Sequence, residues 1–253
     1  MMNGDFLALL PKTPFPSVSP SDSAPTPLHA TTVFAFHCGE GVMIAGDHRA
    51  TAGNIVFSDK TEKILQLDAH SLMAIAGVPA TAFEMARTLQ TTFEFYRRSQ
   101  LQPMSLSAKT RALSKLLRDN LPATIQGFGV VSPIFAGVEP SDTNGKPVIY
   151  FYDPIGAQFE AAAYAGSGSG SGSIKSVLHY LEKWGKPRPD EMSTPQAVRL
   201  AIRLLMTAAE FDTATGGVHP DRREFATIKL LSREGTRSIP LDEQEKYWKE
   251  TNP

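Results

Sequence analysis

The sequence changes character abruptly at residue 31. After Leu10 the leading segment is rich in proline, serine and threonine, and it reads "PKTPFPSVSPSDSAPTPLHA". Such a segment has too few apolar side chains to offset the entropy lost on folding. From Thr31 the sequence "TTVFAFHC" is β-branched and aromatic, and a "GEG" turn leads into "VMIAGD". We therefore expect residues 1–30 to be a disordered or removable leader outside the fold, and residues 31–253 to form one domain that begins with a β-hairpin.

Beyond this hairpin, runs of expected strands are separated by pairs of expected helices. Two helices, at 79–98 and 105–121, carry apolar residues at spacings of three and four. Two more are expected after residue 173 and from Thr194, where Thr194 is a good N-cap residue. The remaining expected strands lie at 62–68, 71–77, 130–139, 147–153, 157–165 and 225–232. This order favours an α+β fold of layered antiparallel sheets covered by helices. The polar tail from Leu241 is expected to fray or to dock on a neighbour.

Composition excludes several classes of protein. The formal net charge is −1 and the pI is about 6.6, so a nucleic-acid or anionic-membrane partner is not expected. No apolar run approaches the roughly 20 residues that a membrane span needs. Cys38 is the single cysteine, which rules out a disulfide framework within the chain and fits a reducing cytoplasm. The leader lacks the basic start and long apolar centre of a secretory signal, so we expect a cytoplasmic protein.

Thr31 has a chemical interpretation that would explain the leader. A threonine hydroxyl is a weak nucleophile and needs a base. Cleavage between Ala30 and Thr31 would create an α-amino group, whose reference pKa of about 7.7–8.0 suits it to take the hydroxyl proton. With the leader attached this amine is blocked, so the precursor would be latent. Because a threonine at a strand start is usually structural, the hypothesis depends on the residues that accompany it.

Those residues include an acid, a base and several glycines. Lys63 could stabilise negative charge on the threonine oxygen, with Asp47 orienting it and keeping it protonated. Gly77, at a strand end, could offer its N–H to an oxyanion. "GSGSGSGS" at 166–173 could be a flexible linker, but it stands between an expected strand and an expected helix. "DTATGG" ends the last expected helix with glycines, and Asp212 there could orient the amine.

Taken together, these motifs resemble the β subunit of the 20S proteasome, especially the bacterial type. That family begins Thr-Thr at its mature terminus and continues with a "GDRR"-like turn, an "EKI"-like stretch, "GSGS" and "DxATGG". Asp47, Lys63 and Gly77 follow Thr31 by 16, 32 and 46 residues. These offsets match the family without a gap, and counting from Thr32 breaks all three. The match runs from Thr31 to about Ile239.

The resemblance implies a four-layer αββα sandwich, with two antiparallel sheets between helical layers, as in N-terminal nucleophile hydrolases. It implies a threonine endopeptidase without metal or cofactor, which degrades unfolded proteins to peptides. Activation would be autocatalytic, by cleavage between Ala30 and Thr31. The implied partners are further copies in heptameric β rings, α-type subunits, a regulatory ATPase ring and polypeptide substrates.

The resemblance also implies a role for each matching residue. Thr31 would be nucleophile and base, Asp47 and Lys63 would support it, and Gly77 would bind the oxyanion. Ser167 and Asp212 would complete the hydrogen-bond network, with Ser169 and Ser171 as alternatives because the Gly-Ser element is doubled. Arg49 and Thr215 would brace the site. The pocket for the residue before the scissile bond would be uncharged, favouring apolar side chains, and would comprise Ala50, Thr51, Thr61, Leu65 and Ile75.

Two departures and three alternatives accompany this interpretation. Ala30 stands where family leaders usually end in glycine, which would slow self-cleavage, and His48 replaces a common arginine. One alternative is the simpler two-ring bacterial threonine peptidase that docks a hexameric unfoldase without α subunits, although its chain is shorter and lacks the "DTATGG" end. A non-catalytic ring-forming subunit is another, but such relatives typically lose the threonine, lysine or aspartate. A small-molecule amidase with an N-terminal nucleophile would not need the ring-building helices.

Overall fold

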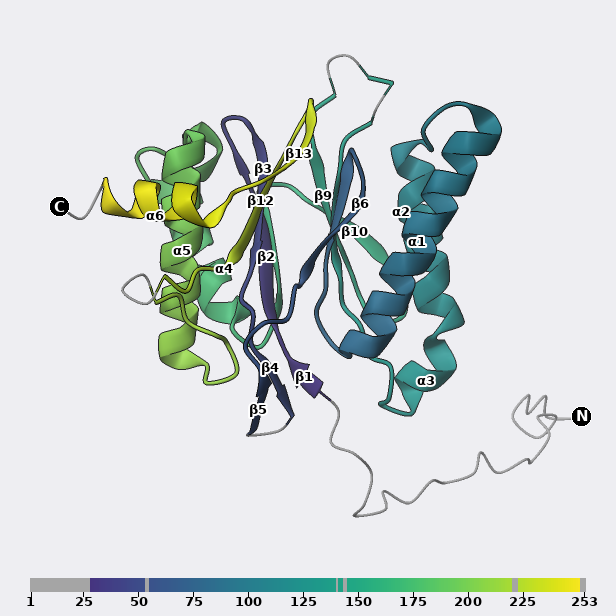
Figure 1. Ribbon diagram of the computed structural model, residues 1–253, viewed down its shortest axis with the longest axis horizontal. Coiled ribbons are helices and arrows are strands. Elements are labelled where there is room, and N and C mark those ends of the chain that lie inside the picture. Colours follow the sequence, from purple (N-terminus) through teal and green to yellow (C-terminus); the bar gives the residue numbers. More distant parts are fainter. Residues whose placement is uncertain (1–27, 53–54, 140, 143–144, 220–222, 251–253) are drawn as a thin grey trace, which may run out of the picture.

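The chain folds into four layers, with two central β-sheets enclosed between helices (Figure 1). The computed structural model describes residues 28–52, 55–139, 141–142, 145–219 and 223–250. The strands are β1 (Leu28–Ala30), β2 (Thr32–Cys38), β3 (Gly41–Gly46), β4 (Ala50–Ala52), β5 (Ile55–Ser58), β6 (Ile64–Asp68), β7 (Ser71–Ala74), β8 (Ile134–Gly137), β9 (Val148–Tyr152), β10 (Gln158–Ala161), β11 (Tyr164–Gly168), β12 (Thr227–Ser232) and β13 (Gly235–Ser238). The helices are α1 (Pro79–Gln100), α2 (Leu106–Asp119), α3 (Leu121–Ile125), α4 (Ser171–Trp184), α5 (Thr194–Phe211) and α6 (Leu241–Lys249), with a 3-10 turn, η2, at Pro189–Glu191.

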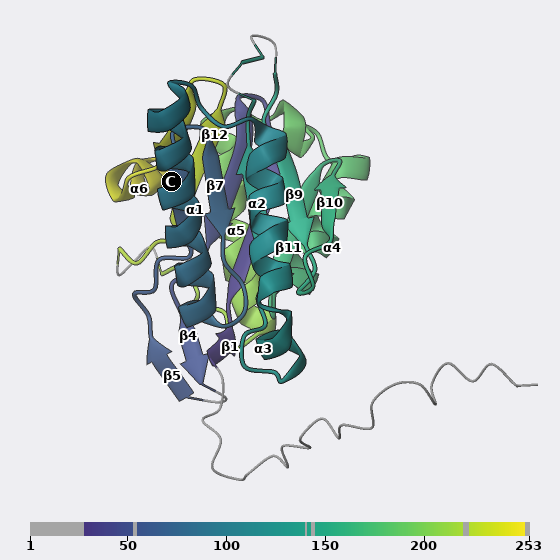
Figure 2. The same ribbon diagram turned by 90° about the vertical axis from the view of Figure 1, so that its right-hand side faces the viewer.

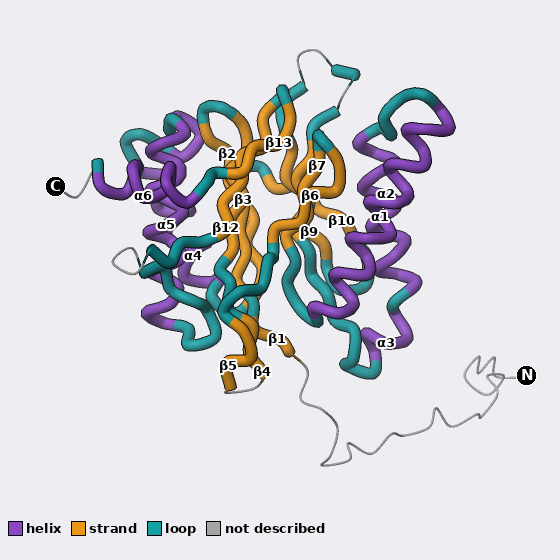
Figure 3. Tube along the Cα trace, viewed as in Figure 1, coloured by secondary structure: helices purple, strands orange, loops and turns teal. Residues whose placement is uncertain are grey.

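The two central sheets are antiparallel and pack face to face. One has the strand order β11-β2-β3-β12-β13 and the other β10-β9-β8-β7-β6. Helices α4 and α5 cover the outer face of the first sheet, and α1 and α2 cover the outer face of the second (Figures 2 and 3). Successive side chains of a strand point to opposite faces. Thus Phe34 and Phe36 of β2 pack toward α4 and α5, while Val33 and Ala35 pack between the sheets.

Three buried apolar clusters correspond to the three interfaces of this arrangement. The first joins the β2 sheet to α4 and α5, the second lies between the sheets, and the third joins the β7 sheet to α1 and α2. Both sheets are therefore apolar on both faces, which explains why these strands read as near-continuous apolar runs in the sequence. The four-layer αββα sandwich implied by the resemblance is confirmed.

The Gly-Ser run is part of the regular structure and does not act as a linker. β11 extends through Gly168, and α4 begins at Ser171. The single strand expected at 157–165 is two strands, β10 and β11, which belong to different sheets. The start of α5 also differs by one residue, because Ser193 is the N-cap and exchanges capping-box hydrogen bonds with Gln196.

Both ends of the described chain differ from expectation. The last three leader residues form β1, which pairs antiparallel with β4 in a small sheet, β1-β4-β5. The expectation that the whole leader lies outside the fold is therefore wrong for residues 28–30, while residues 1–27 lie outside the described residues. The tail forms α6, whose Tyr247 and Trp248 pack against the first apolar cluster. Among the described helices, none has the length and apolar character to cross a membrane.

Candidate active site

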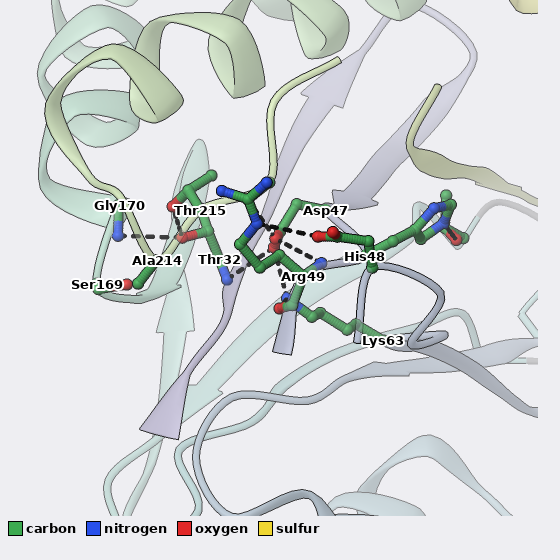
Figure 4. Close-up of polar contacts among 12 residues, drawn as sticks. Thr32, Asp47, His48, Arg49, Lys63, Ser169, Gly170, Ala214 and Thr215 are labelled. Atoms are coloured by element: carbon green, nitrogen blue, oxygen red, sulfur yellow. Dashed lines mark hydrogen bonds and ion pairs between the residues drawn. The ribbon is translucent and has the colours of Figure 1, made fainter. Parts of the chain in front are cut away.

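Asp47 is the hub of a polar cluster at one end of the sandwich, directly after β3. Its Oδ1 accepts hydrogen bonds from the Thr32 amide at 3.0 Å and from Lys63 Nζ at 2.7 Å. Its Oδ2 accepts from the amides of Arg49 at 3.0 Å and Gly216 at 2.7 Å. Figure 4 shows Thr32, Arg49 and Lys63 grouped around this carboxylate. Four donors hold it, so its position is fixed from three separate segments of the chain.

Lys63 and Asp47 form a buried ion pair. Each side chain is only 1% exposed. Lys63 Nζ also donates to the Arg49 carbonyl oxygen at 2.5 Å. Burial lowers the pKa of the Lys63 ammonium from its ordinary value of 10.5, and the charge of Asp47 opposes that shift. The site therefore holds a desolvated cation whose orientation is set by two acceptors on the same turn.

Thr31 and Thr32 have different environments. The hydroxyl of Thr32, which is 0% exposed, lies 2.5 Å from the Thr215 hydroxyl and accepts from the Gly170 amide at 3.0 Å. This hydroxyl is thus used within the fold. Thr31 is 4% exposed, and strand alternation extended back from Val33 directs it toward the second sheet, where Lys63 directly precedes β6. The geometry favours Thr31 as the residue free to do chemistry.

The carbonyl group of Thr31 is held by the end of β11. It accepts a hydrogen bond from the Ser169 amide at 3.1 Å. Gly168 has φ +95°, and a β-carbon at this position would lie 1.6 Å from the Thr31 oxygen. Only glycine accommodates both this backbone conformation and this close approach. The glycines of the run therefore position the backbone of Thr31.

Asp212, the C-cap of α5, accepts hydrogen bonds from two hydroxyl groups. Its Oδ2 accepts from Ser169 Oγ and Thr215 Oγ1, both at 2.6 Å. Because the single Thr215 proton goes to Asp212, the Thr32 hydroxyl must donate to Thr215. Burial acts to raise the pKa of Asp212, but hydrogen bonds from Ser169, Thr215 and the Ala214 amide outweigh it and leave the pKa below its ordinary value. The chain of hydrogen bonds that runs from the Thr32 hydroxyl through Thr215 thus ends at the Asp212 carboxylate.

The structure brings Ser169 to the cluster and leaves Ser167 aside. The Ser167 hydroxyl donates to the Ser132 carbonyl oxygen at 2.7 Å and so links the two sheets. In β11, Ser167 pairs with Val33 and has its side chain between the sheets, whereas Ser169 lies one residue beyond the strand, where the chain turns toward α4. Ser171, at the start of α4, is buried. The first choice from the sequence, Ser167, is therefore replaced here by one of its stated alternatives.

Gly77 has a conformation that requires glycine. Its φ is +112°, and a β-carbon would lie 2.1 Å from the Val130 carbonyl oxygen. It forms an antiparallel bridge with Val131 in which the hydrogen bonds are made by its neighbours, Ala76 and Val78. The N–H of Gly77 itself therefore points away from the 130–132 segment. This leaves it oriented to serve a group outside the sheet.

Arg49 braces the cluster, and the expected pocket residues differ in burial. Arg49 Nε donates to Asp59 at 2.9 Å and Nη1 to the Thr213 carbonyl at 3.2 Å. Ala50 and Thr51 of β4 and Ile75 after β7 are buried, whereas Thr61 and Leu65 are half-buried. Within the described residues, no group of three His, Cys, Asp or Glu side chains is arranged to hold a metal ion.

Several residues of the cluster were not identified from the sequence. Thr32, Gly168, Gly170 and Gly216 contribute through backbone groups or close packing. Two features could have pointed to them, namely the second threonine of "TT" and the doubled glycine of "TGG". The sequence does not show which glycine has a positive φ, because this depends on the segment that packs against it.

The leader strand β1 brings the Ala30–Thr31 bond to this cluster. Ala30 pairs with Thr51 and Leu28 with Ala52, with a register shift between the two pairs. An extended chain that ends at Thr31 is thus held along β4, next to the expected pocket residues. The same edge offers backbone hydrogen bonds to any extended peptide that takes the place of the leader.

Known proteins and a family model are similar to this chain over most of its length. The family model described as "Proteasome subunit" matches residues 28–219, more than half of the chain. "Proteasome subunit beta" of Stackebrandtia nassauensis is 36% identical over 235 residues, 92% of this chain and 81% of that protein. "Proteasome subunit beta 2" of Thermomonospora curvata is 38% identical over 215 residues, 85% of this chain and 74% of that protein. "Proteasome subunit beta" of Acidimicrobium ferrooxidans is 36% identical over 211 residues, 83% of this chain and 74% of that protein. The chain therefore belongs to the proteasome subunit family, and its relatives include bacterial β subunits.

Proposed function

We propose that this protein is the catalytic β subunit of a bacterial 20S-type proteasome, a threonine endopeptidase that hydrolyses unfolded polypeptides. The observation that carries the proposal is the Asp47–Lys63 pair at 2.7 Å, which is buried and accepts a hydrogen bond from the amide of Thr32, the residue after Thr31. A buried ion pair is expensive to keep in a fold and is found where its charge is used. Its position at the start of β2, next to the leader junction, gives it such a use.

Activation follows from the chemistry of the leader junction. Cleavage between Ala30 and Thr31 releases the α-amino group of Thr31, which then takes the proton of its own hydroxyl. Lys63 stabilises the developing negative charge on Oγ and favours the neutral amine. The cleavage is autocatalytic, so residues 1–30 act as a leader that keeps the precursor latent. Ala30, in place of the usual glycine, makes this step slow.

Peptide hydrolysis then proceeds through an ester on Thr31. Oγ attacks the scissile carbonyl carbon, and the N–H of Gly77 binds the resulting oxyanion. Collapse breaks the peptide bond, the amine leaves with a proton, and water hydrolyses the ester to release the acid. Asp212 and Ser169 fix the end of β11 that holds the Thr31 carbonyl. The orientation of the attacking residue is thereby set before substrate arrives.

The substrate is an extended peptide bound along β4, where β1 lies in the precursor. Its residue before the scissile bond enters the pocket formed by Ala50, Thr51, Thr61, Leu65 and Ile75. None of these side chains is charged, so apolar residues are preferred. Neighbouring copies of the chain in a heptameric ring complete this pocket.

The partners of the subunit are inferred from the names of its relatives. The name "Proteasome subunit beta" implies α-type subunits beside the β rings, and the resemblance further implies a regulatory ATPase ring that delivers unfolded chains in the cytoplasm. The two-ring threonine peptidase is the second candidate, and the "Proteasome subunit beta" relatives disfavour it. The retained Thr31, Asp47 and Lys63 disfavour a non-catalytic ring subunit.

The experiment compares wild type with Thr31→Ala after co-expression with an α-type subunit. Intact-mass measurement of assembled wild type should show a chain that begins at Thr31 and hydrolyses peptides with an apolar residue before the cleaved bond. Thr31→Ala should assemble, keep residues 1–30 and hydrolyse nothing. Full peptidase activity in Thr31→Ala would reject the nucleophile.

Thr32→Val is the matched control. It removes the neighbouring hydroxyl and its hydrogen bond to Thr215, so it should weaken activity without preventing cleavage after Ala30. Failure to co-purify with any α-type subunit, together with activation by a hexameric unfoldase, would favour the second candidate.

A further inference from the structure

His48 lies between the two residues that hold Lys63. Asp47 accepts from the Lys63 ammonium with its side chain, and Arg49 accepts with its carbonyl group. The His48 ring itself extends away from Thr32 (Figure 4). Its Nε2 lies 2.7 Å from the Thr227 hydroxyl at the start of β12. None of the steps proposed above uses the histidine.

The proton positions in this contact follow from the next hydrogen bond. The Thr227 hydroxyl donates to Glu62 Oε2 at 3.2 Å, and a carboxylate can only accept. A hydroxyl has one proton, so Thr227 must accept from His48. His48 Nε2 therefore carries hydrogen, in the neutral Nε2–H tautomer or in the imidazolium form. The chain of donors runs from His48 through Thr227 to Glu62.

This chain of hydrogen bonds ends at Glu62, which directly precedes Lys63 in the sequence. Glu62 also accepts from the Ile64 amide through Oε1 at 3.1 Å, so its side chain spans the residues on either side of Lys63. Lys229 lies 3.7 Å from the same Oε1 and donates to the Ile64 carbonyl at 2.6 Å. The backbone of Lys63 is thus fixed from β12, while its ammonium is fixed from the 47–49 turn.

His48 connects these two supports. Its backbone carbonyl accepts from the Thr61 amide at 3.0 Å, and its side chain reaches Thr227. Moving the turn would therefore move both the acceptors of the Lys63 ammonium and the segment from which the lysine extends. We propose that His48 is a positioning residue, which sets the location of the Lys63 ammonium through Thr227 and Glu62. The inference rests on the proposed function, because the consequence is read from peptide hydrolysis.

A hydrogen-bond donor at the Nε2 position is the property that matters. The amide nitrogen of glutamine can occupy a similar place and donate, whereas alanine cannot. At Thr227, serine keeps the hydroxyl, and valine keeps the shape without it. His219 provides a matched control, because it is exposed on a neighbouring loop and its backbone exchanges hydrogen bonds with Glu224.

The experiment measures kcat and KM for a fluorogenic peptide with an apolar residue before the cleaved bond, using assembled full chain with its α-type partner. His48→Ala and Thr227→Val should each lower kcat about tenfold, because a displaced ammonium stabilises the transition state poorly. KM should stay within about twofold, since Lys63 acts on the reacting oxygen. His48→Gln and Thr227→Ser should recover most of kcat, and His219→Ala should match wild type.

A double-mutant cycle gives the decisive comparison. His48→Ala/Thr227→Val should be no slower than either single variant, because both remove the same link. Additive losses, a loss carried by KM, or wild-type kcat in Thr227→Val would each overturn the proposal. If His48→Ala does not assemble, the Thr227→Val and Thr227→Ser pair decides alone. Wild-type activity in Thr31→Ala would instead reject the proposed function, and with it the role of the Lys63 ammonium on which this inference rests.

Discussion

The carbonyl oxygen of Thr31 occupies the space in which residue 168 would carry a β-carbon. The separation would be 1.6 Å, and Gly168 also has φ +95°. Neither atom can easily move away. The oxygen belongs to the backbone and accepts a hydrogen bond from the Ser169 amide, and the position of a β-carbon is set by the backbone of residue 168. The end of β11 and the start of β2 are thus fitted to each other at the candidate nucleophile.

Gly168→Ala should therefore disable the site. The Thr31 backbone or the β11 end must move by more than an ångström, and we expect peptide hydrolysis to fall at least about 100-fold. Gly172→Ala is the control, because a β-carbon there meets nothing within 4 Å. Gly172 lies in α4, and Gly172→Ala should leave activity unchanged. Equal activity of the two variants, measured on assembled protein, would contradict the fit described here.

Ser169 and Ser167 should differ in what their removal changes. Ser169→Ala removes a donor to Asp212 and should lower kcat about tenfold. Ser167→Ala removes a bond to Ser132 and should lower the free energy of unfolding by about 1 kcal/mol, with little effect on kcat. Kinetics and thermal unfolding of both variants check this. The reverse pattern would restore Ser167 as the working serine.

Lys63→Ala should abolish both hydrolysis and leader removal. It leaves the Asp47 carboxylate buried without its ammonium partner, and breaking such a pair costs about 3–5 kcal/mol of unfolding free energy. Because three N–H donors to Asp47 remain in this variant, we expect a loss of unfolding free energy near the lower end of this range. Lys115→Ala breaks an exposed pair with Asp119 and should cost less than about 1 kcal/mol. Normal leader removal in Lys63→Ala would reassign the role of the lysine.

The pH dependence of activity should have an alkaline limb from Lys63. Burial lowers the pKa of this ammonium below 10.5, so the proton is lost at a lower pH than from an exposed lysine. Activity should decline as the pH rises through the pKa of Lys63, because the deprotonated Lys63 side chain no longer stabilises negative charge on the Thr31 oxygen. Lys63→Arg stays protonated throughout, so any residual activity of this variant should lack the limb. An unchanged limb in this variant would assign it to another group.

The lowered pKa of Asp212 predicts that the protein loses stability at acid pH. Its pKa in the folded protein is below its ordinary value of 3.8, so its stabilising contribution is complete above that pH. The contribution is lost as the pH falls through the lower, folded value. The difference in Tm between wild type and Asp212→Asn should thus be constant from about pH 5 to 8 and shrink below about pH 4. A difference that grows on acidification would contradict the shift.

The sequence predicted the layered fold because its strands and helices have strong, separate periodicities. The hairpin that leads from Thr31 to Asp47 and the strands on either side of Ala69–His70 are where their patterns place them. The split of 157–165 was missed because a run of small residues reads the same in one strand or in two. The helix at Leu241–Lys249 was missed because its polar surface hides the few residues that contact α5.

For the site, spacing identified the charged residues better than the hydroxyls. Asp47 and Lys63 have fixed offsets from Thr31, and the structure joins them. In "GSGSGSGS" Ser167, Ser169 and Ser171 each stand between two glycines, so composition cannot distinguish Ser167 from Ser169. The distinction arises where the strand ends, at Gly168, and this depends on the Thr31 carbonyl packed against it.

The pairing of β1 with β4 has a consequence for the moment after the leader is cut. Hydrolysis of the Ala30–Thr31 bond removes a covalent tether, but the backbone pairs of Leu28 and Ala30 with β4 remain. Under the proposed mechanism the severed segment is the first product, and it still occupies the edge of β4 along which a substrate peptide would bind. On that mechanism the subunit starts out inhibited by its own cleavage product, and its first turnover has to wait until that peptide dissociates.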